Sequence, residues 1–256
     1  MEDPTVVEGF LRDIVLLEAI GINPVIVHGG GKVITARMKE EGIETRFVAG
    51  QRVTSREAVT IVEQSLDRVV NSQIVETFQS FGGKAVGLSG KNVFVASKLP
   101  LQRNNAGELE DVGFVGEVAE IKPALVRCIV ESGETPVISP IGASPDGQIY
   151  NINADLAAAA LAEKLQATKL IYASDVEGVL RDAKDPASRL SSISMEQIED
   201  LIRTGVVSGG MIPKLLSAAR AIRAGVQKVH MIGGHLPHCL LLEIFSDSGI
   251  GTEITK

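Results

Sequence analysis

Short apolar runs rich in Val and Ile alternate along this chain with longer segments of helical periodicity. The runs are bounded by Gly, Pro, Ser or Asp, which is typical of buried strands. They are PVIVH (24–28), KAVGLSG (84–90), TPVISPIG (135–142), KLIYAS (169–174) and KVHMIGG (228–234). Strands that alternate with helices form parallel sheets covered by helices. We therefore predict an α/β fold, a three-layer αβα sandwich around a mostly parallel open sheet.

Helical patterns fill the intervals between these runs. An amphipathic helix is predicted near the N-terminus, where Phe10, Leu11, Ile14, Val15 and Leu17 share one face. A long helix is predicted from Ser55 to about Phe81, with a break near Asn71. Further helices are predicted at 32–42, 122–133, 153–167, 194–205, 210–225 and 235–249. From the distribution of motifs we expect two lobes, 1–150 and 151–256, that share one continuous sheet.

The chain has 256 residues and a formal net charge of −7. This charge argues against general binding to nucleic acid or to a membrane surface. An acidic protein can still bind anions through loop amides, helix N-termini and single Lys or Arg residues.

The two cysteines, Cys128 and Cys239, lie far apart in apolar runs and belong to no Cys/His pattern. We expect buried free thiols in a reducing, cytoplasmic compartment. No apolar stretch reaches about 18 residues, so no transmembrane helix is expected. Acidic residues from the second position onward argue against a secretory signal.

The segment HGGGK, His28 to Lys32, joins a predicted strand to a predicted helix. Glycines let backbone N–H groups approach an anion, and the helix N-terminus adds partial positive charge. The segment is not a Walker A loop, which would need a glycine at Ile26 and Ser or Thr at Val33. It is not GxGxxG with an acid about twenty residues on either. A tight turn is the alternative to an anion site, and His28 alone is more typical of a structural residue.

Two further segments carry polar side chains at predicted loop–helix junctions. Arg52, in GQRVTSRE, could bind a carboxylate through both arms of its guanidinium, or it could be a solvated loop residue. In YNINAD, the alternation of Asn151, Asn153 and Asp155 is typical of extended residues that share one face. The alternative is that Asn153 or Asp155 caps the following helix.

The C-terminal half offers two more loops. Asp175 follows a predicted strand, with Gly178 nearby, as expected of a loop beside a nucleotide. Gly209 and Gly210 precede a helix with Lys214 in its first turns. A lysine is electrostatically unfavourable near a helix N-terminus unless an anion binds there, so Lys214 is a candidate phosphate ligand, with a surface lysine as the alternative.

The motifs HGGGK, QRVT, GFVGEV, YNINAD, SDVEGVL and GGMIPK, in this order, resemble those of the acetylglutamate kinases of the amino acid kinase family. The resemblance runs from about residue 4 to the end. It implies transfer of the γ-phosphoryl group of ATP, with Mg²⁺, to the side-chain carboxylate of N-acetyl-L-glutamate, in arginine biosynthesis. The sequence shows no cluster of metal ligands, so Mg²⁺ would be held mainly by phosphates and water.

The resemblance also implies roles for individual residues. Gly29, Gly30 and Gly31 would hold the substrate, Arg52 its α-carboxylate, and Asn151 would contact it. Asp155 would orient the catalytic lysines, and Lys214 would stabilise the transferring phosphoryl group. The ATP site would be lined by Asp175, Val176, Gly178, Val179, Leu180, Val206, Val207, Ser208, Gly210 and Met211.

The end of the chain resembles the arginine-inhibited members of the family. His230, Glu243 and Gly249 match positions that bind the inhibitor there; the alternative is a core histidine and a solvated helix acid. A homodimer or higher homo-oligomer is implied, with the helix from Ser55 as a candidate dimer face. A PII-type signalling partner is a further expectation.

One departure from the family pattern concerns the N-terminus. The family's first strand carries a Lys-x-Gly-Gly motif with a second catalytic lysine, and this sequence lacks it. We expect impaired activity from the chain as written, because one such donor is worth about 10²–10³ in rate. A catalytically silent arginine sensor or PII-interacting protein, or a kinase of another carboxylate, are the alternatives.

Overall fold

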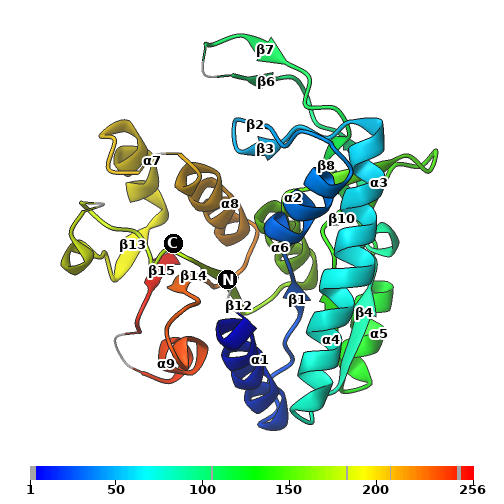
Figure 1. Ribbon diagram of the computed structural model, residues 1–256. Helices are drawn as coiled ribbons and strands as arrows, with labels where there is room; N and C mark the ends of the chain where they lie inside the picture. Colours follow the sequence, from blue (N-terminus) through cyan, green and yellow to red (C-terminus); the bar gives the residue numbers. More distant parts are fainter. Residues whose placement is uncertain (1–3, 105, 183, 208, 247–248) are drawn as a thin grey trace. The chain divides into compact units, whose positions relative to one another are not determined.

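The computed structural model describes residues 4–104, 106–182, 184–207, 209–246 and 249–256 (Figure 1). They form two compact units, one within residues 17–157 and one that combines residues 4–16 with residues 158–256. The predicted α/β class is confirmed, because parallel strands alternate with helices along the chain. The boundary between the two units falls after residue 157.

The unit of residues 17–157 contains a three-stranded parallel sheet and a small barrel. The sheet has the order β1 (Ile26–Val27), β9 (Thr135–Ile138) and β4 (Ala85–Leu88). The barrel consists of β10 (Ile141–Ala143), β11 (Ile149–Ile152), β8 (Val115–Ile121) and β5 (Phe94–Lys98). Two short antiparallel pairs complete the unit: β2 (Phe47–Val48) with β3 (Gln51–Arg52), and β6 (Gln102–Arg103) with β7 (Leu109–Glu110).

The long predicted helix is present and has a local irregularity. It comprises α3 (Arg56–Gln64), a π-helical turn η1 (Ser65–Val70) and α4 (Asn71–Ser80). The predicted break near Asn71 corresponds to this π-helical turn. In Figure 1 the three segments run as one rod, drawn in cyan, and α4 contacts β4. The remaining helices of this unit are α2 (Gly31–Glu40), the 3₁₀ turn η2 (Gly90–Asn92) and α5 (Ala124–Glu131).

Apolar residues one helical turn apart bind α2 to the rod. Ile34 and Met38 of α2 pack in one buried cluster with Ala58, Val62 and Leu66. This spacing is the expected apolar stripe of two helices that cover the same core. It places the N-terminus of α2, and hence the glycine-rich loop, beside the π-helical turn.

The second unit is built on a four-stranded mixed sheet. Its order is β12 (Lys169–Ser174), β14 (Lys228–Gly233), β15 (Thr252–Thr255) and β13 (Ser192–Ser194), with β14 and β15 antiparallel. The helices are α7 (Met195–Arg203), α8 (Met211–Arg223), α9 (Cys239–Phe245), and the 3₁₀ turn η3 (Pro186–Ser188). Helices α1 (Pro4–Ala19) and α6 (Ala154–Leu165) each contribute residues to both units. Among the described residues, the strands of each sheet come from one unit only.

One burial prediction was wrong. Cys239 is buried, and burial raises the pKa of its thiol to about 11. Cys128, however, is exposed. The reason is the position of each residue around the helix. Val126 and Ile129 lie on the buried face of α5, and Cys128 therefore lies on the face exposed to solvent.

Candidate functional site

The glycine-rich loop lies between the end of β1 and the start of α2. Gly30 is the N-cap residue of α2, and Gly31 is its first residue. Among the described residues, no acceptor is found for the backbone N–H groups of Gly29 and Gly30. These groups, at a helix N-terminus, are suited to bind an anion, as the motif predicts.

Gly30 is also required by packing. A Cβ built on Gly30 would lie 2.6 Å from Cδ2 of Leu66, which is buried in the core. A Cβ built on Gly29 would meet nothing within 4 Å. The close approach of the loop to the π-helical turn therefore depends on a glycine at position 30 alone.

We expect Gly30→Ala to lower the free energy of unfolding by about 1–3 kcal/mol, because the added methyl group overpacks the Leu66 site. Gly29→Ala is the matched control and should leave stability nearly unchanged. Urea unfolding of both variants measures the difference. Equal stability of the two variants would contradict the packing described here.

Arg52 is held in a buried shell beside this loop. Its Nη2 donates hydrogen bonds to the carbonyl of Gly31 (3.0 Å) and to Oγ1 of Thr35 (3.0 Å), and Nη1 to Oγ1 of Thr45 (3.3 Å). The guanidinium also lies over the ring of Phe47, 4.8 Å from its centroid. Arg52 is only 7% exposed, so the solvated-loop alternative does not hold.

The charge of Arg52 has no acidic partner among the described residues. Burial lowers the pKa of its guanidinium, although arginine stays protonated in proteins. A buried charge without a counterion is unfavourable, and a ligand carboxylate would supply the missing partner. Arg52 is therefore a strong candidate for binding an anionic substrate.

The YNINAD segment enters α6 from strand β11. Asn153 is the capping residue, because its Oδ1 accepts hydrogen bonds from the N–H groups of Asp155 (2.9 Å) and Leu156 (3.2 Å). Asn151 lies in β11, and Asp155 lies in the first turn of α6. The predicted extended alternation therefore ends at Asn153. Since Asn153 caps the helix, Asp155 is not needed for that role.

The loop after β12 is only partly open. Asp175 and Val176 are exposed. By contrast, Val179 is buried, and its N–H donates to Oγ1 of Thr252 at 2.8 Å. Gly178 is buried as well, and Leu180 forms a β-bridge with Arg189. Structural roles therefore account for the second half of this predicted nucleotide segment.

The loop before α8 contains the other predicted nucleotide residues. Val207 is buried in the core, whereas Gly210 is exposed and caps α8, and Val206 and Met211 are half-buried. Gly209 has a φ of +56°, a left-handed conformation that favours glycine. Ser208 lies outside the described residues.

Lys214 is the fourth residue of α8, as predicted, and its side chain is half-buried. Its Nζ lies 5.5 Å from the ring centroid of Tyr172 in β12. The hydroxyl of Tyr172 forms a hydrogen bond of 2.8 Å with Ser217 Oγ. The ring attracts the ammonium group, and Lys214 lies near the N-terminus of the helix, where the dipole favours an anion.

The three residues proposed for an arginine site lie together in the second unit. His230 Nδ1 is 2.6 Å from Glu243 Oε1, and Glu243 Oε2 accepts the N–H groups of Ile250 (2.7 Å) and Gly251 (2.8 Å). A Cβ built on Gly249 would lie 2.8 Å from Glu243 Oε2. Burial alone would raise the pKa of Glu243, but these hydrogen bonds lower it below its ordinary value.

We expect Glu243→Gln to lower the free energy of unfolding by about 1–3 kcal/mol at pH 7. Both oxygens of the carboxylate accept hydrogen bonds, whereas the NH₂ group of glutamine can only donate them. The lowered pKa means that the stabilisation by Glu243 exists above the ordinary carboxyl pKa and is lost as the pH falls. The difference in unfolding free energy between the wild type and Glu243→Gln should therefore become smaller towards acid pH. Urea unfolding at several pH values measures it, with Glu199→Gln on the exposed face of α7 as the control.

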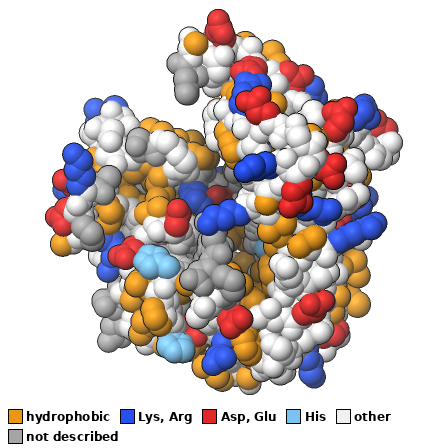
Figure 2. All heavy atoms as spheres, viewed as in Figure 1, with side chains coloured by type: hydrophobic (Ala, Val, Ile, Leu, Met, Phe, Trp, Pro, Cys, Tyr) orange, Lys and Arg blue, Asp and Glu red, His pale blue; other side chains and the backbone are white. Residues whose placement is uncertain are grey.

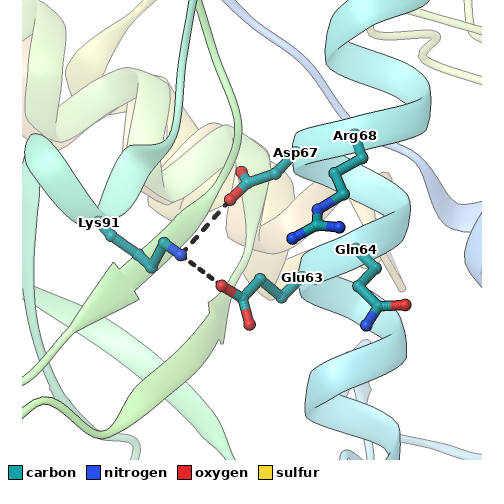
Figure 3. A pocket seen from close by; sticks show the side chains of 5 residues that line it. All are labelled: Glu63, Gln64, Asp67, Arg68 and Lys91. Atoms are coloured by element: carbon teal, nitrogen blue, oxygen red, sulfur yellow. Dashed lines mark hydrogen bonds and ion pairs between the residues drawn. The ribbon is translucent and has the colours of Figure 1, made fainter.

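Two surface pockets contain none of the predicted site residues. One, of about 230 Å³, is lined by Glu63, Gln64, Asp67, Arg68 and Lys91. Figure 3 shows the ammonium group of Lys91 between Glu63 and Asp67, at the π-helical turn. The other, of about 270 Å³, lies beside β13 and α7.

On the face shown in Figure 2, basic and acidic side chains are interspersed. This distribution is consistent with anion binding through local groups. In the part of the chain that the structure describes, no helix is both long and apolar enough to cross a membrane.

Sequence reasoning missed several residues around the site. No motif marks the residues that surround Arg52, which are Thr35, Thr45 and Phe47. The same holds for the contact of Gly30 with Leu66 and for the pairing of His28 with Asn71. The one related prediction was the break in the helix near Asn71, where the structure has a π-helical turn.

Comparison with known proteins identifies relatives along nearly the whole chain. A family model described as "Amino acid kinase family" matches residues 1–233. The acetylglutamate kinase of Akkermansia muciniphila is 48% identical over 257 residues, which cover 100% of this chain and 86% of that protein.

Two solved structures are also similar. The structure of smu.665 from Streptococcus mutans has a TM-score of 0.79 at 32% identity and covers 96% of this chain and 91% of that one. N-acetylglutamate synthase from Neisseria gonorrhoeae, complexed with coenzyme A and N-acetyl-glutamate, has a TM-score of 0.85 at 24% identity. It covers 99% of this chain and 57% of that chain, and it supports the fold alone.

Proposed function

The chain belongs to the amino acid kinase family, and on this premise we propose that it phosphorylates the side-chain carboxylate of N-acetyl-L-glutamate with ATP, in arginine biosynthesis. The observation that carries the proposal is the 48% identity, over the whole chain, to a protein named acetylglutamate kinase. Arg52 supports the proposal independently, because its buried guanidinium lies beside the glycine-rich loop and is suited to bind a carboxylate.

The reaction needs charge compensation more than it needs a base. A carboxylate nucleophile with an ordinary pKa of about 4.3 is already ionised at pH 7. The difficulty is to bring it close to the γ-phosphate, since both are anions. We assign the α-carboxylate of the substrate to Arg52, the reacting oxygens to the amides of Gly29–Gly31, and the substrate's amide region to Asn151.

Phosphoryl transfer also requires cations at the transferring group. In the proposal, Lys214 stabilises the phosphoryl group and Asp155 orients the lysine side chain. The exposed residues Asp175, Val176 and Gly210, with the half-buried Val206 and Met211, contact the nucleotide. The buried residues Val179 and Val207 support these loops from the core.

The proposal includes Mg²⁺ bound with ATP. The described residues contain no group of three or more His, Cys, Asp or Glu side chains arranged to bind a metal. We propose that nucleotide phosphates and water supply most of the ligands of the ion, as is usual for Mg²⁺ in phosphoryl transfer. When bound, the ion neutralises charge on the phosphates, and the residues named above position the substrates.

We further propose that arginine inhibits the enzyme at the His230–Glu243–Gly249 cluster. Glu243 has a lowered pKa and is therefore ionised at pH 7, as a guanidinium partner must be. Calorimetry with L-arginine tests this point, and absence of binding at high millimolar concentration would contradict it. A homo-oligomer that uses the α3–α4 rod and a PII-type partner are further proposals.

The experiment that tests the function is a coupled assay of ADP release with N-acetyl-L-glutamate, aspartate and carbamate as separate acceptors. We expect turnover with N-acetyl-L-glutamate above that with the other two. Equal or better turnover with aspartate or carbamate would assign the chain to another branch of the family. Arginine binding without any turnover would favour a silent arginine sensor.

A further inference from the structure

His28 occupies a buried position directly under the glycine-rich loop. It follows β1, its backbone N–H donates to the carbonyl of Ile138 (3.2 Å), and its side chain is 7% exposed. The imidazole ring makes two contacts. Nδ1 lies 2.8 Å from the carbonyl oxygen of Gly29, and Nε2 lies 3.1 Å from Nδ2 of Asn71.

These contacts define the protonation of the ring. A carbonyl oxygen can only accept, so Nδ1 must carry the proton that is shared with Gly29. Burial lowers the pKa of His28, so the ring is neutral and Nε2 is an acceptor. Asn71 supplies the matching donor through Nδ2, which also donates to the carbonyl of Val137 at 2.9 Å. The acidic side chain that acts on the ring is Asp67, on the π-helical turn.

Asn71 reaches this place because of two local features. It is the first residue of α4, immediately after the π-helical turn, and an extra residue in a turn rotates the following side chains about the helix axis by roughly 100°. Gly87 of β4 leaves room for it, since a Cβ built there would lie 2.3 Å from Asn71 Oδ1. The π-helical turn and this glycine together bring the amide of Asn71 against the sheet.

The consequence lies in the loop. The peptide that joins Gly29 to Gly30 is planar and trans, so its carbonyl and its N–H point in opposite directions. Because the buried His28 ring holds the Gly29 carbonyl, the Gly30 N–H must point away from that ring. That N–H has no acceptor among the described residues.

We propose that His28, oriented by Asn71, is a positioning residue that directs the Gly30 N–H towards the transferring phosphoryl group. His28 does not touch the substrate; it determines which way the 29–30 peptide faces. The kinetic consequence rests on the proposed function, whereas the orientation of the peptide does not.

A pair of substitutions separates positioning from simple packing. In His28→Asn the side-chain nitrogen occupies the place of Nδ1, so the hydrogen bond to Gly29 is kept and the contact with Asn71 is lost. In His28→Gln the amide occupies the place of Nε2, so the contact with Asn71 is kept and the hydrogen bond to Gly29 is lost. We expect kcat to fall roughly 10²-fold in His28→Gln and far less in His28→Asn, with similar Tm values. Unchanged kcat in His28→Gln, or equal losses of kcat and Tm in both variants, would overturn the proposal.

A second readout does not depend on turnover. Nitrogen NMR of the wild-type protein should show a neutral His28 ring protonated at Nδ1. The Gly30 amide resonance should shift on addition of inorganic phosphate in the wild type and His28→Asn, but not in His28→Gln. A ring protonated at Nε2, or the same shift in all three proteins, would overturn the proposal even if another substrate replaced N-acetyl-L-glutamate. Failure of wild-type turnover with these NMR results intact would contradict only the proposed function.

Discussion

Replacement of Lys214 by methionine is expected to lower kcat by about 10²–10³-fold, with a much smaller change in the KM for N-acetyl-L-glutamate. The reason is that the ammonium group is proposed to act on charge that develops on the transferring phosphoryl group. Methionine keeps an unbranched side chain against the Tyr172 ring, so the core of the second unit should be retained. Steady-state kinetics with both substrates varied measures the effect.

The control for this variant lies on the same helix. Arg220 of α8 is exposed and pairs at the surface with Glu163 at 3.5 Å, so Arg220→Met removes a charge without touching the loop before α8. It should leave kcat nearly unchanged, since surface ion pairs contribute little. Similar losses in both variants would indicate that net charge, and not the position of Lys214, is responsible.

Replacement of Arg52 by lysine is expected to raise the KM for N-acetyl-L-glutamate by about 10²–10³-fold, while the KM for ATP changes little. Lysine keeps the charge but lacks the planar fork that binds a carboxylate in two places. It also cannot reproduce the hydrogen bonds to Gly31, Thr35 and Thr45 together, so the side chain loses its fixed orientation. Initial-rate kinetics, with circular dichroism to verify folding, measures the effect.

The matched control for Arg52 is Arg46→Lys. Arg46 precedes β2, is half exposed and pairs with Glu110 at the surface. Its replacement should leave the KM for ATP and the KM for N-acetyl-L-glutamate equal to those of the wild type within experimental error. A rise in the KM for ATP equal to that for N-acetyl-L-glutamate in the Arg52 variant would mean that Arg52 supports the loop without binding the acetylated substrate.

Much of the fold could be predicted because long helices and buried strands have strong periodic patterns. The helix predicted at 194–205 corresponds to α7, and its start carries a capping box of Ser194 and Gln197. The β-strands β13 and β15 were missed, since three- and four-residue strands with mixed polarity carry little periodicity. The exposure of Cys128 was missed because hydrophobicity alone does not give helical phase.

The place of a candidate site residue in the fold was predictable where a sequence motif marks it, and not where tertiary contacts determine it. The glycine-rich loop and Lys214 stand at helix N-termini, as the motifs indicate. Burial of Arg52 depends on threonines from two other segments, and its neighbours could not be read from local sequence. The pairing of His28 with Asn71 joins residues 43 positions apart through a π-helical turn. Propensity rules do not predict such turns, which is why the arrangement appears only in three dimensions.

The central claim is that this chain makes an acyl phosphate on the side chain of N-acetyl-L-glutamate. The most direct measurement is to trap that product with hydroxylamine, which displaces inorganic phosphate and leaves a hydroxamate that mass spectrometry identifies. We expect ATP-dependent formation of the N-acetylglutamyl hydroxamate, strongly reduced in the Lys214→Met variant. Absence of this hydroxamate, while another carboxylate or carbamate is phosphorylated under the same conditions, would contradict the account.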